Sequence, residues 1–180
     1  MFTNNWFEIT GKDNFKKYVL PLKSKALNYL EVGCYEGQAS VWLLENSRAE
    51  LTVVDTFKRG QDLPDEVNLF ERFNENTKDY YKRIRARIGR SSEMLKTLEP
   101  DFFDFIYIDG SHLAKDVLED AVLAFPLLKK GGIMIFDDYT WGQGLDIYQR
   151  PCFGVDAFVN VYGNQLIVLE RNSQLIIKKI

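Results

Sequence analysis

Short apolar runs alternate along the chain with longer segments in which apolar residues recur every three or four positions. The apolar runs are rich in β-branched and aromatic residues and span 26–32, 51–54, 103–108 and 133–136. Strands of a parallel sheet have this composition when both of their faces are buried. The helical patterns lie between them, at 38–45, 66–81 and 114–129. This alternation predicts βαβ units, and therefore a doubly wound α/β sheet with right-handed crossovers.

The end of the chain departs from this rhythm. Two strand-like runs, at 165–170 and 174–179, are separated by Arg171, Asn172 and Ser173. A connection of this length is typical of a β-hairpin. The sheet is therefore predicted to end with an antiparallel strand.

A basic segment at 80–90 allows three interpretations. Its arginines alternate with Ile84, Ala86 and Ile88, as in a strand with one charged face. Such charges protect an edge strand from pairing with other chains. A substrate-facing patch and a nucleic-acid-binding patch stay open as alternatives. Because the whole chain carries a net charge of −3, it has no bulk attraction for nucleic acid, and no such partner is expected.

The composition indicates a single globular domain spanning 1–180. Hydrophobic residues make up 46% of the 180 residues and charged residues 27%, which excludes a disordered chain. A chain of this length buries a core without a disulfide or a metal. The segment before the first strand, 1–25, is expected to form a short N-terminal cap. A cap this thin leaves the pocket either open or completed by a partner subunit, which would make the protein a homo-oligomer.

The sequence also predicts a cytoplasmic protein. Cys34 and Cys152 are the only cysteines and lie far apart in the chain. This favours a reducing compartment over a disulfide-bonded secreted scaffold, and Cys34 is expected to serve packing. The first residues lack the basic and apolar regions of a signal peptide, and no apolar run approaches the ~20 residues that cross a bilayer. No membrane partner is expected.

A glycine-containing turn, EVGCYEG at 31–37, follows the first apolar run and opens a helix. Gly33 allows the tight turn, and Gly37 allows close packing of the helix on the sheet or close approach of a ligand. The turn lacks the G-x-G-x-x-G fingerprint of dinucleotide sites, which disfavours an NAD-dependent dehydrogenase.

The acidic residues near this turn suggest what it binds. Glu31 lies at the end of the first strand, where a carboxylate suits an ammonium group better than a phosphate. Asp55 follows Gly33 at the offset of about 20 residues that is typical of acids binding ribose hydroxyls. An ammonium-bearing ligand with a ribose and no pyrophosphate is S-adenosylmethionine (SAM). Alternatively, Glu31 caps a helix and Asp55 is a solvated strand end.

Together with the segments 89–91, 103–112 and 127–139, these residues resemble the class I SAM-dependent methyltransferases. The most similar branch contains small bacterial proteins like the macrocin-type sugar and the catechol-type, metal-dependent O-methyltransferases. The resemblance extends over 28–180. It implies a Rossmann-like, seven-stranded sheet of order 3-2-1-4-5-7-6, with strand 7 antiparallel and helices on both faces.

The resemblance also implies which residues bind SAM. The glycine turn would hold its methionine end, Asp55 its ribose, and the segment after the third strand its adenine. The implied cofactor-binding residues are Glu31, Gly33, Tyr35, Gly37, Asp55, Gly89, Ser91 and Ser92. The chain departs from its relatives at Ala39, where many carry a serine. Ser40 follows, but it is expected to point elsewhere on the helix.

Three aspartates follow the last two predicted parallel strands. Asp109 ends the fourth strand, and Asp137 and Asp138 end the fifth. Because neighbouring parallel strands end at the same edge of a sheet, these carboxylates should converge within a few ångströms. Acids this close repel one another unless one is protonated or a cation enters, and oxygen ligands suit Mg²⁺, Ca²⁺ or Mn²⁺.

A divalent-metal site, with Mg²⁺ as the first choice, is therefore predicted at these three aspartates, and the resemblance points the same way. In the alternative interpretation, Asp109 caps the helix that starts near residue 113, and the other two are solvated loop acids.

His112 is the only histidine and lies three residues after Asp109. Its ordinary pKa near neutrality would let it accept a hydroxyl proton. The resemblance implies a base here, since catechol-type relatives carry a lysine and some sugar-type relatives a histidine. Asp109 and His112 are therefore the predicted catalytic residues, although His112 would also fit as a helix-start residue that bonds backbone or contacts the adenine. The aromatic residues Tyr139, Trp141 and Tyr148 would form either a lid over the pocket or an ordinary surface connection.

These features predict a SAM-dependent methyltransferase that methylates an oxygen of a small hydroxylated acceptor, either a sugar or a phenol/catechol-like compound, with the help of a divalent cation. The alternative is a binding or regulatory protein that keeps the fold without turnover.

Overall fold

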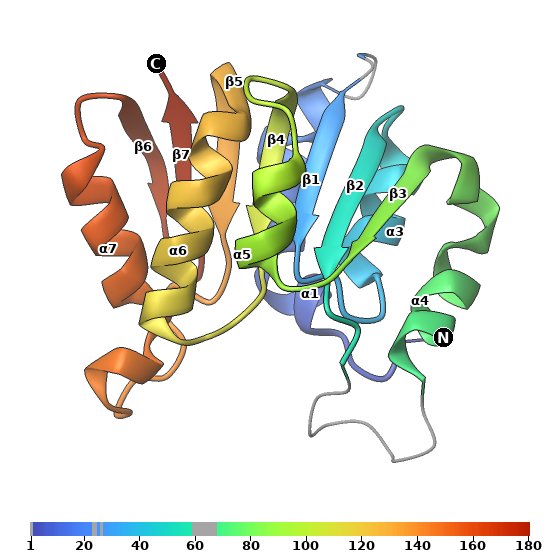
Figure 1. Cartoon of the computed structure of the whole chain (residues 1–180), viewed down its shortest axis with the longest axis horizontal. Coiled ribbons are helices and arrows are strands. Elements are labelled where there is room, and N and C mark those ends of the chain that lie inside the picture. The colour runs from blue at the N-terminus through green and yellow to red at the C-terminus, as the bar shows by residue number, and fades with distance from the viewer. Residues whose placement is uncertain (1, 23–24, 26, 59–67) are drawn as a thin grey trace.

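Parallel strands form the centre of the molecule. A computed structural model of the chain describes residues 2–22, 25, 27–58 and 68–180. Among these, seven strands form one sheet in the order β3-β2-β1-β4-β5-β7-β6, with β7 antiparallel to both of its neighbours (Figure 1). The predicted strand order and the antiparallel strand 7 are thus confirmed. The strands are β1 (Asn28–Val32), β2 (Glu50–Asp55), β3 (Ile84–Ile88), β4 (Phe103–Ile108), β5 (Leu128–Phe136), β6 (Leu166–Arg171) and β7 (Leu175–Lys179).

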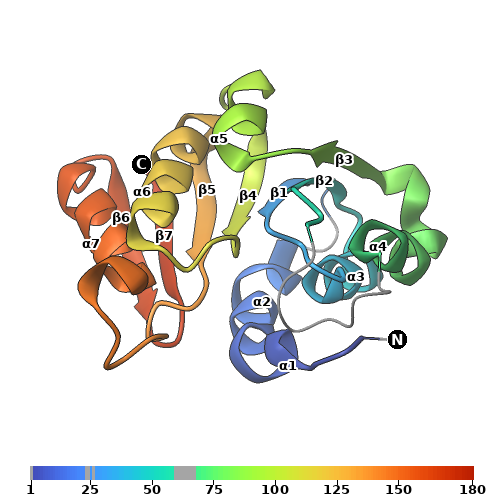
Figure 2. The ribbon, with the colours of Figure 1, turned by 60° about the horizontal axis from the view of Figure 1, so that its bottom comes forward.

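Helices cover both faces of the sheet, as predicted (Figure 2). Phe15 and Trp42 are buried on one side, and Val117 and Phe158 on the other. The first side holds α1 (Trp6–Thr10), α2 (Lys12–Tyr18), α3 (Gln38–Asn46) and α4 (Leu69–Thr77), and the second holds α5 (Ser91–Met94), α6 (Ala114–Ala124) and α7 (Pro151–Val161). None of the helices in the described ranges has the length and apolar content needed to span a membrane.

Several element boundaries differ from the sequence prediction. The helix predicted over 114–129 stops at Ala124, because Pro126 has no N–H to donate to a continuing helix. The chain turns through η4 (Phe125–Leu127) into β5, which therefore starts five residues earlier than the predicted 133. The helix predicted over 66–81 is α4, followed by η2 (Lys78–Arg83). Residues 66 and 67, like the predicted strand start at 26, lie outside the described residues.

Helix α7 has no counterpart among the predicted helices. Its apolar residues occupy both buried positions, such as Val155, and exposed ones, such as Val161, so no single apolar stripe marks it. Gly154 lets α7 approach α6 closely, since a Cβ there would lie 2.1 Å from the backbone oxygen of Ala114. The packing of α6 against α7 therefore depends on a glycine rather than on a periodic pattern.

The basic segment lies at one edge of the sheet. Its residues 84–88 form β3, where Arg85 and Arg87 are exposed, and this position supports the edge-strand interpretation. Arg83 has a structural role instead. Its guanidinium donates to the backbone oxygens of Leu44, Ser47 and Ala49, in and just after the last turn of α3.

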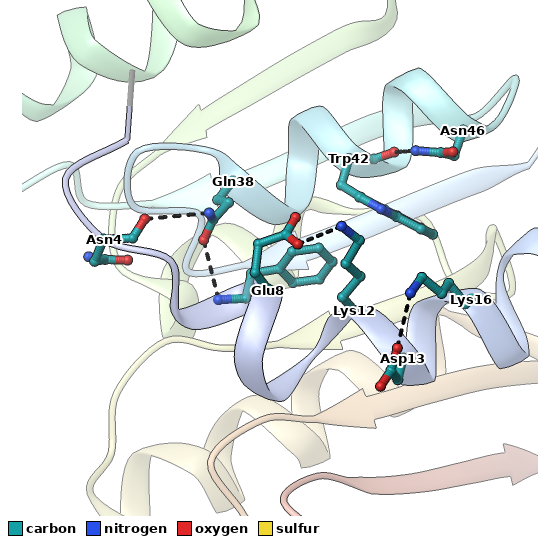
Figure 3. A network of polar contacts seen from close by, with 9 residues as sticks. Asn4, Glu8, Lys12, Asp13, Lys16, Gln38, Trp42 and Asn46 are labelled. Carbon is teal, nitrogen blue, oxygen red and sulfur yellow. Dashed lines mark hydrogen bonds and ion pairs between the residues drawn. The ribbon is translucent and has the colours of Figure 1, made fainter.

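The N-terminal cap is bonded to the start of α3 (Figure 3). The side chain of Gln38 accepts a hydrogen bond from the backbone N–H of Phe7 at 3.3 Å and donates to the backbone oxygen of Asn4 at 3.4 Å. The rings of Phe7 and Phe15 are buried, with their centroids 4.9 Å apart. Helices α1 and α2 are thereby held against the element that follows the glycine turn.

Candidate active site

A cavity of about 400 Å³ opens at the carboxyl ends of β1, β2 and β4. In open α/β sheets, ligands bind at this edge, where the strand order reverses. We refer to it as the strand-end cavity. Most of the predicted cofactor-binding residues line it, namely Gly33, Tyr35, Asp55, Gly89, Ser91 and Ser92. Glu31 and Gly37 are not among the lining residues.

Two glycines shape the turn after β1. Gly33 has a φ of +82°, and a Cβ there would lie 2.2 Å from the backbone oxygen of Asp109. No other residue fits this point without moving β1 or the end of β4. Gly37 has a φ of +85° at the start of α3, and a Cβ there would lie 2.9 Å from the ring of Phe73 in α4. Gly37 therefore allows helix packing rather than forming a wall of the cavity.

Asp55 holds the glycine turn in place. One carboxylate oxygen accepts the backbone N–H groups of Cys34 at 2.8 Å and Tyr35 at 3.0 Å, and the other accepts that of Phe57 at 2.7 Å. Three backbone donors thus fix the carboxylate while it faces the strand-end cavity. Cys34 itself is buried, as its predicted packing role requires.

Glu31 lies buried behind the turn, with a relative exposure of 1%. The hydroxyl of Ser40 donates to its carboxyl group at 2.6 Å. Ser40 does not line the strand-end cavity, in keeping with the expectation that it points elsewhere, because the buried face of α3 turns it toward Glu31 at the end of β1. Burial raises the pKa of Glu31 from 4.5 to about 8, the bond from Ser40 opposes this shift, and the nearby charge of Asp55 adds to it. The group therefore carries a proton at neutral pH.

The acidic face of α6 belongs to the strand-end cavity but was not among the predicted site residues. Asp116, Glu119 and Asp120 line the cavity together with Ser91. Asp120 is buried, which raises its pKa to about 6, while the nearby hydroxyl of Ser91 opposes this shift. The signal in the sequence is the spacing of three to four residues, which places these acids on one helix face.

Asp109, Asp137 and Asp138, which we call the acidic trio, converge at the ends of β4 and β5. Each offers a carboxylate oxygen, and these oxygens lie within 4.8 Å of one another. Burial, followed by the charges of Asp137 and Asp138, raises the pKa of Asp109 well above its ordinary value. Burial and the charge of Asp138 also raise the pKa of Asp137. The expected convergence is present, and a donor set of oxygens that repel one another fits a divalent cation.

The structure contradicts the alternative role of Asp109 as a helix cap. Helix α6 starts at Ala114, and its N-cap residue, Leu113, makes no side-chain capping bond. Instead, the backbone N–H of Asp109 continues the sheet by donating to Val32, and its side chain belongs to the acidic trio.

His112 lies against the acidic trio rather than in the strand-end cavity. Its Nε2 lies 2.7 Å from a carboxylate oxygen of Asp138, and its ring centroid lies 4.4 Å from that of Trp141. The hydrogen bond that His112 donates to Asp138 raises the pKa of His112 against the opposing effect of burial. Nε2 of His112 is thus engaged by Asp138.

The aromatic segment after the trio is anchored at one end and exposed at the other. The hydroxyl of Tyr139 donates to Asp156 at 2.9 Å, whereas Trp141 and Tyr148 are exposed. Trp141 covers His112, as a lid residue would, while Tyr148 has no such contact among the ring pairs of the described residues.

Comparison with known proteins identifies the family. The model of a family described as a methyltransferase domain matches residues 30–139, which is more than half of the chain. An uncharacterized protein of Acanthamoeba polyphaga mimivirus is 27% identical over 115 residues, covering 63% of this chain and 52% of that protein. The chain therefore spans about half the length of this relative.

Solved structures share the fold at low identity. An O-methyltransferase from Bacillus cereus in complex with SAH is 16% identical, with a TM-score of 0.68, covering 95% of this chain and 82% of that one. The O-methyltransferase TomG from Streptomyces achromogenes, in complex with SAM, is 16% identical, with a TM-score of 0.67 and coverages of 95% and 81%.

The methyltransferase MycE of the mycinamycin biosynthetic pathway, in complex with Mg, SAH and mycinamycin VI, is 15% identical, with a TM-score of 0.65 and coverages of 99% and 50%. These structural similarities show that the fold is shared. The match to the family model, in contrast, shows which family the chain belongs to. The chain belongs to the methyltransferase-domain family and has its class I fold.

Proposed function

We propose that this protein transfers the methyl group of SAM to a hydroxyl oxygen of a small acceptor, assisted by a divalent cation. The observation that carries the proposal is that the acidic trio adjoins the strand-end cavity, since Asp109 belongs to both. Two proteins of the same fold support it: TomG was solved with SAM, and MycE with Mg, SAH and mycinamycin VI. The acceptor would be a sugar or a phenol/catechol-like compound.

The strand-end cavity is the proposed SAM site. Its volume of about 400 Å³ lies within the range of small-ligand pockets. Asp55 would accept the ribose hydroxyls, and the segment from Gly89 to Ser92 would line the adenine. Glu31 lies behind the turn, and a positively charged ligand would favour its ionised form over the protonated one.

The acidic trio is the proposed cation site. Asp109, Asp137 and Asp138 would supply oxygen ligands, and Mg²⁺ is the ion that suits them when water or substrate oxygens complete its shell. A bound cation would lower the pKa of an acceptor hydroxyl and fix its orientation. His112 could hold a proton beside the trio. It could accept a proton from the acceptor only while the imidazole paired with Asp138 is neutral.

The loop after the trio would complete the site. Methyl transfer is an in-line displacement that depends chiefly on the orientation of donor and acceptor. Trp141, whose ring lies tilted against that of His112, would cover the acceptor and exclude water. A cytoplasmic location and a homo-oligomeric state belong to the same proposal, and sedimentation of the purified chain tests the latter.

Calorimetric titration with SAM and with Mg²⁺, combined with a turnover assay, tests this function. We expect both ligands to bind and Asp137→Ala to lower turnover by at least ~100-fold, while the affinity for SAM stays within a few-fold. Glu99→Ala, which removes an exposed acid before the start of β4, is the control. Loss of SAM binding in Asp137→Ala would assign this acid to the donor instead. No heat with either ligand would overturn the proposal and favour a non-catalytic protein that keeps the fold.

A further inference from the structure

A buried glutamine lies beside the acidic trio. Strands β5 and β7 are antiparallel, with Phe136 paired to Leu175. Asp137 directly follows β5 and Gln174 directly precedes β7, so the register brings these two side by side. Gln174 is fully buried. A polar side chain at such a position must find partners inside the protein.

Neutral donors hold both carboxylate oxygens of Asp137. The side-chain N–H of Gln174 donates to one oxygen at 2.8 Å, and the hydroxyl of Tyr107 donates to the other at 2.5 Å. These bonds fix the rotation of the carboxylate without neutralising its charge. Each oxygen still has a lone pair, because a carboxylate offers about four acceptor positions.

The N-terminal cap determines the orientation of the Gln174 amide. Asn14 of α2 is buried, with a relative exposure of 6%, and its side-chain N–H donates to the oxygen of Gln174 at 2.8 Å. Asn172 supports this arrangement by accepting the backbone N–H of Gln174 at 2.9 Å. A reversed amide would turn the oxygen of Gln174 toward Asp137 and its NH₂ toward that of Asn14, so both contacts would be lost.

We propose that Gln174 is a positioning residue for Asp137, and that Asn14 acts through Gln174 by fixing the direction of its amide. The inference rests on the proposed function, in which Asp137 is a cation ligand. It assigns the N-terminal cap a part in the cation site, although no residue of the cap belongs to the acidic trio. Partners of this kind typically change metal affinity 10- to 100-fold, because they orient the ligand that the metal requires.

Binding of Mn²⁺ to the full chain, followed by electron paramagnetic resonance of the free ion, tests the inference without a turnover assay. Asn14→Asp replaces the donor that faces Gln174 with an acceptor, and Gln174→Leu removes the amide. We expect each to weaken Mn²⁺ binding by ~10- to 100-fold, while the affinity for SAH, measured by calorimetry, stays within a few-fold. Asn160→Asp introduces the same charge at an exposed position of α7 and should leave Mn²⁺ binding unchanged.

A double variant separates positioning from general loss of structure. If Asn14 acts through Gln174, Asn14→Leu combined with Gln174→Leu weakens Mn²⁺ binding no more than Gln174→Leu alone. If the double variant loses more Mn²⁺ affinity than Gln174→Leu alone, Asn14 does not act through Gln174. If the variants lose Mn²⁺ and SAH affinity equally, the effect is a general loss of structure, and the proposal is also wrong. If Asn14→Asp and Gln174→Leu bind Mn²⁺ as tightly as the unmodified chain does, the positioning role is wrong while the proposed function stands. If the unmodified chain binds no Mn²⁺, both are wrong.

Discussion

Asp55, in the strand-end cavity, accepts three backbone N–H groups, whereas the acidic trio presents three carboxylates to one another at oxygen separations within 4.8 Å. In the first region, backbone N–H groups stabilise the negative charge of Asp55, and the same hydrogen bonds fix the shape of the glycine turn. In the second, the charges repel, and burial raises the pKa of Asp109 and of Asp137. Both regions lie at the same edge of the sheet, and Asp109 belongs to each.

This difference separates two ways of preparing a binding site. The cavity has its shape before a ligand arrives, because the glycine turn and its hydrogen bonds define it. The acidic trio stores unfavourable electrostatic free energy that a cation would release. Substitutions in the cavity should therefore destabilise the protein, whereas removing one charge of the trio should stabilise the metal-free protein and abolish cation binding.

The largest effect is expected at Gly33. Gly33→Ala combines a left-handed backbone with a Cβ 2.2 Å from the oxygen of Asp109, and we expect a loss of at least ~3 kcal/mol in the free energy of unfolding. Gly131→Ala is a matched control, since φ is +81° there and nothing lies within 4 Å of the added Cβ. It should cost only about 1 kcal/mol. Urea denaturation compares the two, and equal losses would show that the close approach to Asp109 does not matter.

A smaller effect, dependent on pH, is expected at Glu31. Burial raises its pKa from 4.5 to about 8, so the folded state holds a proton that the unfolded state loses. The stability contributed by this proton is complete below pH 4.5 and declines as the pH rises toward 8. Relative to Glu31→Gln, the unmodified chain should lose about 2 kcal/mol between about pH 5.5 and pH 7.5.

Denaturation at these two pH values measures the slope. Glu45→Gln, at an exposed position of α3, serves as the control and should keep the pH dependence of the unmodified chain. A Glu31→Gln variant with that same dependence would show that Glu31 is ionised in the folded protein.

The smallest effect, of opposite sign, is expected in the acidic trio. Asp109→Asn removes a carboxyl group whose ionisation is disfavoured by burial and by the neighbouring aspartates, and should raise the stability of the metal-free protein at pH 8 by about 1 kcal/mol while Mn²⁺ binding is lost. Asp104→Asn, in the strand that Asp109 follows, should instead destabilise, because Asp104 accepts from Lys129 at 2.8 Å and from the backbone N–H of Asn28 at 2.9 Å. Thermal melts in a chelator test both signs. Destabilisation by Asp109→Asn would remove the contrast between the two regions.

The sequence by itself determined the order of the elements and the edge at which the chemistry gathers. Apolar runs alternating with helical patterns specify parallel strands, and the acids that follow those runs must then lie at one edge. Asp55, Asp109 and Asp137 could be placed in this way because Asp55 ends β2 and the other two directly follow β4 and β5. The turn at Gly33 could be placed for the same reason.

Only the tertiary structure decided which side chains meet across that edge. Ser40 bonds Glu31, and Asn14 reaches Asp137 through Gln174, a residue 160 positions along the chain from Asn14. Local periodicity carries no information about such contacts, because they depend on the packing of helices on the sheet and on the register between strands. The residues that bring charges to the site follow from the chain's pattern, and the protons and hydrogen bonds that tune those charges follow from its packing.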